Sequence, residues 1–129
     1  MSGRPCIVVA DDSRTAVTVL SFALSKEGYE VVTAADGLEA LDRIRESRPQ
    51  IVILDGMMPG RDGFEVAAEV RADLLLEPQP HIIMITAEGR DVDRERAHAS
   101  GVDDFLNKPF SPSELLAKVR DALDAGAVS

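Results

Sequence analysis

Three aspartates directly follow short apolar runs, in positions where carboxylates could bind a metal ion. Asp11 and Asp12 come after residues 6–10, and Asp55 comes after residues 51–54. Short runs that are apolar on both faces are typical of central strands in a parallel sheet. Open sheets of this kind bind ligands at the carboxyl ends of their strands. The three carboxylates are therefore expected at one edge of a sheet.

Carboxylates this close repel one another unless a cation neutralises them, because neighbouring strands lie only about 4.8 Å apart. A hard divalent cation, most simply Mg²⁺, binds one or two protein carboxylates, keeps several waters and leaves room for a phosphate. A lone Asp at a strand end is more often a helix cap or a turn residue than a metal ligand. The prediction of a metal site thus depends on all three acids being together.

Two further polar residues end later strands. Thr86 closes the apolar run 81–86, and Lys108 follows the short run 104–107. Alone, Thr86 reads as a buried strand residue bonded to the backbone, and Lys108 as a solvated lysine. Beside three carboxylates and a cation, however, a hydroxyl and an ammonium group could bind phosphoryl oxygens. Together the five residues outline a phosphoryl site.

Strand and helix patterns alternate along the chain and would position these residues. Gly28 is expected to cap the first helix, and Pro78 and Pro80 to end the third. The helix at 91–100 has a thin apolar face, so it is a candidate for a mobile switching element. The predicted strands are 6–10, 30–34, 51–54, 81–86 and 104–107. The predicted helices are 13–27, 36–48, 62–76, 91–100 and 111–123, with residues 124–129 as a frayed tail.

Five successive βα units predict a three-layer α/β/α fold around a parallel sheet, because such crossovers are right-handed. A doubly wound five-stranded sheet in the order 2-1-3-4-5 is expected, since a closed barrel needs eight units. In this order the chain reverses direction between strands one and three, beside the acids. A chain of 129 residues suits a single domain over residues 1–129.

The composition limits which partners the protein could bind and in which cellular compartment it could work. A formal charge of −9 argues against direct nucleic-acid binding, which needs a Lys/Arg footprint. Cys6 is the single cysteine, so an internal disulfide is impossible and a reducing compartment fits. The sequence has neither a signal-peptide pattern nor an apolar run long enough to span a bilayer. We therefore expect a cytoplasmic protein that has no membrane partner.

The combined motifs resemble the receiver domain of two-component response regulators, the family that includes CheY. The matching pieces, in chain order, are Asp11-Asp12, the loop Asp55–Gly63, Thr86-Ala87 and Lys108-Pro109-Phe110. The resemblance implies a flavodoxin-like, CheY-like fold and a role in a phosphorelay. The phosphoryl donor would be a sensor histidine kinase or a histidine phosphotransfer protein.

The resemblance also implies the chemical roles. Asp55 would be the phosphoacceptor in a reaction that depends on Mg²⁺. Asp12, Asp55 and the backbone carbonyl of Met57 would bind Mg²⁺ directly, and Asp11 through water. Lys108 would pair with one phosphoryl oxygen.

The switch is implied in the same way. Thr86 would move to hydrogen-bond a second phosphoryl oxygen, and Phe105 would turn inward when it does. The Lys108–Pro109 bond is expected to be cis. The family often has Tyr where this chain has Phe105. Because Phe has no hydroxyl, the inward orientation cannot be stabilised by the hydrogen bond that Tyr would form. Met57 and Glu88 occupy the positions that influence the rate of dephosphorylation in the family. The lifetime of the phosphorylated state does not follow from these two residues.

The resemblance implies a signalling phosphoacceptor, limited to self-phosphorylation and autodephosphorylation, rather than an enzyme acting on external substrates. A downstream protein would bind across the helix at 91–100, the strand at 104–107 and the last helix, because no output domain follows. The chain could be free-standing or excised from a longer protein, and a monomer or a dimer formed on activation. The kinase and target stay open.

Two other functions compete with this interpretation. A metal-dependent phosphatase with an Asp nucleophile typically has a second acid two residues later, where this chain has Met57. A flavodoxin-like cofactor binder would need a phosphate loop rich in Gly, Ser or Thr after the first strand, and Asp11-Asp12 has the wrong charge. His81 and His98 are assigned no role.

Overall fold

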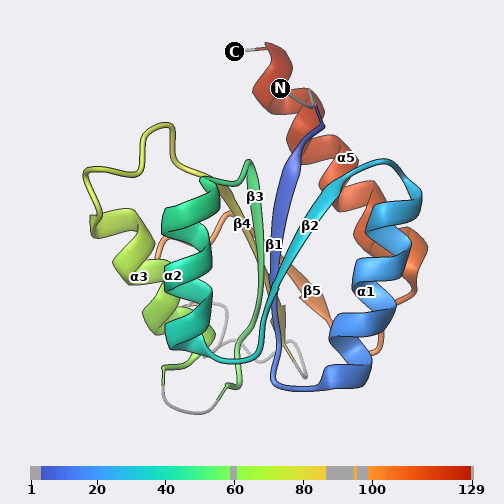
Figure 1. The fold of residues 1–129 in the computed structure, drawn as a ribbon, viewed down its shortest axis with the longest axis horizontal. Coiled ribbons are helices and arrows are strands. Elements are labelled where there is room, and N and C mark those ends of the chain that lie inside the picture. Colours follow the sequence, from blue (N-terminus) through green and yellow to red (C-terminus); the bar gives the residue numbers. More distant parts are fainter. Residues whose placement is uncertain (1–3, 59–60, 87–94, 96–98, 129) are drawn as a thin grey trace.

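The computed structural model describes residues 4–58, 61–86, 95 and 99–128. Five parallel strands form one sheet in the order β2-β1-β3-β4-β5, which confirms the predicted doubly wound topology (Figure 1). The strands are β1 (Cys6–Ala10), β2 (Glu30–Ala34), β3 (Ile51–Asp55), β4 (His81–Thr86) and β5 (Asp104–Asn107).

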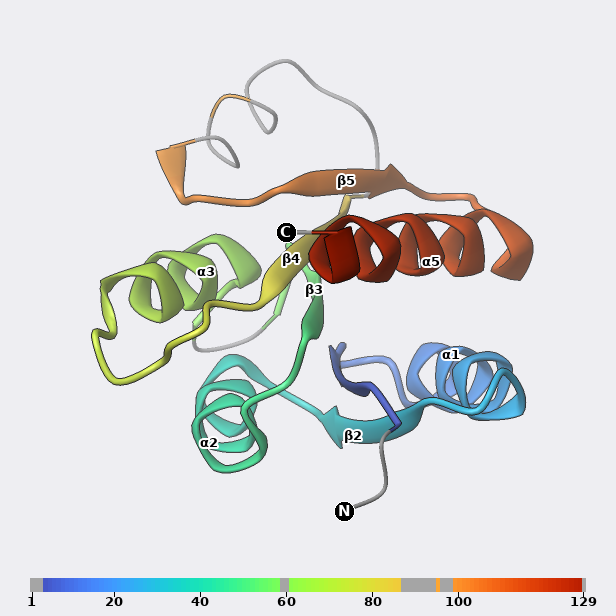
Figure 2. The ribbon, with the colours of Figure 1, turned by 90° about the horizontal axis from the view of Figure 1, so that it is seen from above.

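Helices cover both faces of this sheet and complete the predicted three layers. Figure 2 shows α2 and α3 on one face and α1 and α5 on the other. Their bounds are α1 (Arg14–Lys26), α2 (Gly37–Ser47), α3 (Gly63–Ala72) and α5 (Pro112–Val128). The helix predicted at 91–100 lies outside the described residues, apart from positions 95, 99 and 100. Within the described residues, no helix is both long and apolar enough to cross a membrane.

The central strands are apolar on both faces because each face supports its own core. Successive side chains on a strand point to opposite faces. In β3, Val52 and Leu54 pack with α2 and α3, whereas Ile51 and Ile53 pack with α1 and α5. All four are essentially inaccessible to solvent. Each such side chain stabilises the fold by roughly 1.5–3 kcal/mol, so the sheet edge that bears the acids has a rigid base.

Side-chain caps define where the helices begin. The Asp62 carboxylate accepts the Glu65 N–H, and Glu65 accepts the Asp62 N–H, which is a complete capping box. At α2 the Asp36 side chain accepts the Glu39 N–H. However, the Glu39 carboxylate accepts the N–H of Ala35 instead of that of Asp36. Each cap satisfies backbone donors that have no partner within the helix.

Two helix ends differ from the prediction. α3 ends at Ala72 rather than Leu76, because the Asp73 carboxylate accepts the N–H of Leu75 and so forms a turn. α5 continues to Val128, through residues predicted to be a frayed tail. Alanine is the strongest helix former and is frequent there, which outweighs the single glycine in this stretch.

Candidate metal and phosphoryl site

The carboxyl ends of β1 and β3 bring three acids together. Asp11, Asp12 and Asp55 each offer one carboxylate oxygen, and these oxygens all lie within 4.8 Å of one another. β1 and β3 are direct neighbours, with Ala10 opposite Leu54, so the residues that follow them meet. Asp11 and Asp55 are buried and Asp12 is exposed. The cluster is therefore open to solvent on one side and enclosed on the other.

Asp11 is the least solvated acid of the cluster, at 2% exposure. Its Oδ1 accepts the Ser13 N–H at 2.9 Å. Its Oδ2 is buried and has no hydrogen-bond partner among the described residues. Burial raises the pKa of Asp11 to about 6, the Ser13 N–H opposes the rise, and the nearby Asp55 charge adds to it. A buried carboxylate oxygen without a partner is costly, and a nearby cation would compensate that cost.

The donors fit a hard divalent cation. They are all carboxylate oxygens, which Mg²⁺ and Ca²⁺ prefer over nitrogen or sulfur ligands. Asp11, whose Oδ2 is unpartnered, belongs to this cluster, so a cation bound by the three acids would compensate both its burial and its repulsion by Asp55.

Asp55 is held at both of its oxygens. Its Oδ1 accepts the Met57 N–H at 3.0 Å, and its Oδ2 lies 3.4 Å from the Lys108 Nζ. The carboxylate is buried, whereas the Lys108 side chain is 41% exposed. A flexible ammonium group thus reaches from solvent to a fixed acid. These two contacts fix the orientation of the Asp55 carboxylate.

Gly63 allows α3 to begin directly against the acid. A Cβ at this position would lie 2.4 Å from the backbone oxygen of Asp55 and 2.9 Å from the sulfur of Met84. The Gly63 N–H also donates to the Gly56 carbonyl at 3.3 Å, which closes the loop after β3. Only glycine permits this close approach.

Thr86 ends β4 at the same edge, but its hydroxyl has a partner that the sequence did not predict. Thr86 Oγ1 donates to Asn107 Oδ1 at 2.8 Å. The two residues are opposite each other in the parallel pair β4–β5. The alternative of a strand Thr bonded to backbone is wrong for this hydroxyl. A possible signal was that Asn107 directly precedes Lys108 and ends a strand that must pair with β4.

Comparison with known proteins identifies the family. The sequence model described as Response regulator receiver domain matches residues 7–120. The chain belongs to the response regulator receiver domain family. It is therefore a receiver domain of two-component signalling, a family of phosphoacceptors that interact with histidine kinases or phosphotransfer proteins.

Solved receiver domains have the same fold. Chemotaxis protein CheY4 of Vibrio cholerae is 33% identical, with 93% of this chain and 99% of that chain covered and a TM-score of 0.87. A CheY-like receiver domain protein of Methanospirillum hungatei JF-1 is 27% identical, with 95% and 96% covered and a TM-score of 0.88. The DrrB receiver domain activated by BeF3 is 28% identical, with 94% and 98% covered and a TM-score of 0.84.

The other residues discussed in the sequence analysis lie at several places in the fold. Phe105 is half-buried and packs against the core on the α2 and α3 face. The Lys108–Pro109 bond is cis, as is Glu77–Pro78. His81 lies at the amino end of β4, with its Nδ1 3.8 Å from the Asp103 carboxylate, and so away from the acids. Ala87, Glu88 and His98 lie outside the described residues.

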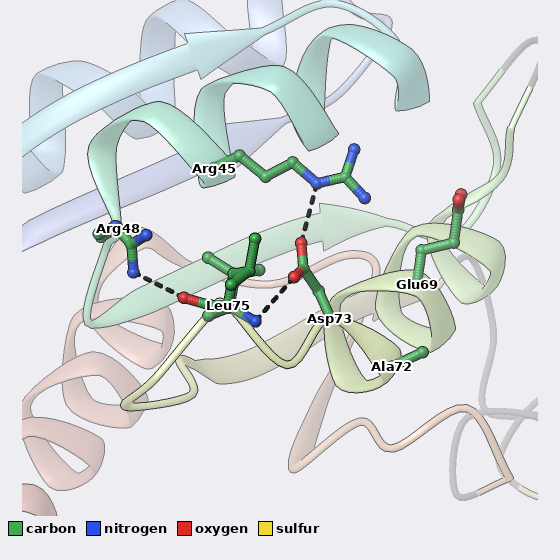
Figure 3. Close-up of a pocket in the computed structure, with 7 residues that line it drawn as sticks. Arg45, Arg48, Glu69, Ala72, Asp73 and Leu75 are labelled. Atoms are coloured by element: carbon green, nitrogen blue, oxygen red, sulfur yellow. Dashed lines mark hydrogen bonds and ion pairs between the residues drawn. The ribbon is translucent and has the colours of Figure 1, made fainter.

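A surface hollow of about 470 Å³ lies at the opposite end of the receiver domain, between the carboxyl ends of α2 and α3. Figure 3 shows Arg45 bonded to Asp73 and Arg48 bonded to the carbonyl of Leu75. These contacts tie α2 to the segment after α3. None of the residues predicted to do chemistry lines this hollow.

Proposed function

We propose that Asp55 accepts a phosphoryl group from a phosphohistidine of a sensor kinase or phosphotransfer protein, and that the phosphorylated chain changes its protein contacts. The observation that carries this proposal is the position of Asp55. It is buried, clustered with two other acids, and 3.4 Å from Lys108 at the carboxyl edge of the sheet.

In this reaction an oxygen of the Asp55 carboxylate attacks phosphorus. A P–O bond forms, the P–N bond to histidine breaks, and the partner's imidazole nitrogen takes up a proton. The Met57 N–H holds the carboxylate in position for this attack. The Lys108 ammonium neutralises negative charge on a phosphoryl oxygen. Water later hydrolyses the acyl phosphate.

Mg²⁺ is the cofactor that suits this chemistry. Asp12, Asp55 and the backbone carbonyl of Met57 would bind it directly, and Asp11 through a water. When bound, the cation supplies positive charge to the phosphoryl oxygens and relieves the repulsion among the acids. The unpartnered Oδ2 of Asp11 supports this assignment.

The signal follows from added charge. An acyl phosphate brings about two negative charges and strong acceptor oxygens to Asp55. Thr86 and Lys108 move toward these oxygens, and the Phe105 side chain on β5 repacks. A downstream protein then binds across β5, α5 and residues 91–100. The chain acts as a signalling phosphoacceptor and not as an enzyme for external phosphoesters.

The stoichiometry of phosphoryl uptake tests this function. The chain is incubated with Mg²⁺ and excess acetyl phosphate, and both bound phosphoryl and released phosphate are followed. A phosphoacceptor takes up at most one phosphoryl group per chain, and it releases phosphate only by hydrolysis of its own acyl phosphate. Rapid, sustained hydrolysis of an unrelated phosphoester such as p-nitrophenyl phosphate would contradict the proposal and favour a phosphatase.

A further inference from the structure

We propose that Asn107 is a positioning residue that holds Thr86 in the unphosphorylated orientation and so opposes the switch. This inference rests on the proposed function, because it requires Thr86 to donate a hydrogen bond to a phosphoryl group on Asp55. It is carried by a different observation, the hydrogen bond of 2.8 Å from Thr86 Oγ1 to Asn107 Oδ1.

The backbone keeps these two residues facing each other. Thr86 and Asn107 are paired across β4 and β5, so their side chains share one face of the sheet. The Lys108 N–H donates to the Thr86 carbonyl at 2.8 Å and closes the end of this strand pair. Thr86 is buried and Asn107 is exposed. The hydrogen bond therefore joins a fixed hydroxyl to an amide at the solvent boundary.

The hydroxyl has one proton to give. A phosphoryl oxygen and the Asn107 carbonyl are both acceptors, so Thr86 donates to one or the other. Moving to a phosphoryl oxygen requires that the bond to Asn107 break. Because Asn107 is exposed, water can replace Thr86 as its donor, and the net penalty is that of an ordinary hydrogen bond. Such a bond shifts an equilibrium by roughly 2- to 13-fold.

Asn107 is also next in the chain to Lys108, the other residue proposed to bind a phosphoryl oxygen. It immediately precedes Lys108, whose Nζ lies 3.4 Å from Asp55. The side-chain bond that holds Thr86 is therefore formed by the residue next to the lysine, at the same end of β5. The residue at position 107 would set how readily the phosphoryl group recruits Thr86 and Lys108 together.

Titration with beryllofluoride in the presence of Mg²⁺ tests this role without a partner protein. Beryllofluoride is chosen because the DrrB receiver domain is described as activated by it. Calorimetry gives the affinity, and the methyl signal of Thr86 in labelled protein reports its orientation. Asn107→Ala should bind beryllofluoride roughly 2- to 13-fold more tightly. Without ligand, its Thr86 signal should move toward the bound position.

A double-mutant comparison separates positioning from a structural role. Thr86→Val removes the proton that Asn107 accepts, so adding Asn107→Ala to Thr86→Val should leave the affinity unchanged. Asn107→Val is a second variant that also lacks the hydrogen-bond acceptor, and valine is favoured in strands. It should behave like Asn107→Ala, so that misfolding of one variant would not be mistaken for a loss of the hydrogen bond. An equal gain in both backgrounds would show that Asn107 does not act through Thr86.

The remaining outcomes also decide the matter. Unchanged or weaker binding by Asn107→Ala and Asn107→Val would overturn this inference alone, because the unaltered chain would still bind beryllofluoride. If the unaltered chain shows no Mg²⁺-dependent binding that requires Asp55, the proposed function fails and this inference fails with it.

Discussion

The Nζ of Lys108 lies 3.4 Å from Oδ2 of Asp55, although the two residues are 53 positions apart in the chain. Lys108 follows β5 and Asp55 ends β3, with β4 between these strands. The lysine therefore reaches across the neighbouring strand to the acid. Among the residues that the structure describes, Lys108 is the one basic residue that forms an ion pair with any of the three clustered acids.

Lys108→Ala should tighten Mg²⁺ binding by the acids while impairing the response to phosphorylation. Removing a unit positive charge beside the cluster is worth about 1 kcal/mol at solvent-like dielectric, or roughly fivefold in affinity. Isothermal titration with Mg²⁺ measures this change. Lys118→Ala is the matched control, because Lys118 pairs with Asp104 on β5 instead. Weaker Mg²⁺ binding by Lys108→Ala alone would contradict the described arrangement.

The metal-free protein should lose stability as pH rises from about 4 to 6. Burial raises the pKa of Asp11 from 3.8 to about 6, so the folded protein binds a proton that the unfolded chain has already released. The penalty for ionising Asp11 is absent below pH 4 and complete above pH 6. Urea unfolding without metal should show Asp11→Asn to be more stable than the unaltered chain at pH 7, by about 1–3 kcal/mol.

The difference in stability between Asp11→Asn and the unaltered chain should shrink below pH 4, where Asp11 is protonated in both the folded and the unfolded state. Saturating Mg²⁺ should also remove it, since the cation compensates the buried charge. An Asp11→Asn variant that is less stable than the unaltered chain at neutral pH without metal would be inconsistent with an uncompensated carboxylate.

Gly63→Ala should destabilise the fold by about 1–3 kcal/mol and reduce phosphoryl uptake. The added methyl group would meet the Asp55 carbonyl, so α3 or the acid must shift. Gly28→Ala is the control: it has a φ of +92° but open space around it, so its cost of about 1–2 kcal/mol is backbone strain alone. Uptake should remain normal in Gly28→Ala; equal uptake in both variants would argue against a tight fit at Gly63.

Thr86→Val should still take up a phosphoryl group, but movement at Phe105 should be lost. Valine keeps the shape of threonine and removes the hydroxyl that must bond the phosphoryl oxygen. Ring signals of Phe105 in labelled protein, compared with and without beryllofluoride, measure the coupling. Thr33→Val on the exposed side of β2 is the matched control. A normal Phe105 shift in Thr86→Val would remove Thr86 from the switch.

The strands and the acid cluster could be predicted from the sequence because both depend on simple rules. Apolar runs such as 51–54 pack on two faces, and parallel strands end at one edge. This places Asp11, Asp12 and Asp55 together before any side-chain geometry is known. Thr86 and Lys108 could be placed at the same edge because each stands at the end of a later strand, and the family motifs then implied their roles.

Other features depend on tertiary contacts that spacing does not encode. The apolar run Leu74-Leu75-Leu76 continues the helical pattern of α3, yet Asp73 turns the chain and pairs with Arg45 of α2. The Asn107 partner of Thr86 follows from the register of β4 with β5 and from side-chain rotamers. Neither is visible in a periodicity of apolar residues.

Intact mass after incubation with acetyl phosphate tests the central claim most directly. The unaltered chain, Asp55→Asn and Asp36→Asn are compared with and without Mg²⁺. Asp36 caps α2, and asparagine caps as well as aspartate, so the last variant makes the same change outside the site. We predict a gain of one phosphoryl group that requires Mg²⁺ and is lost only in Asp55→Asn. Uptake by Asp55→Asn, or none by the unaltered chain, would contradict Asp55 as the phosphoacceptor.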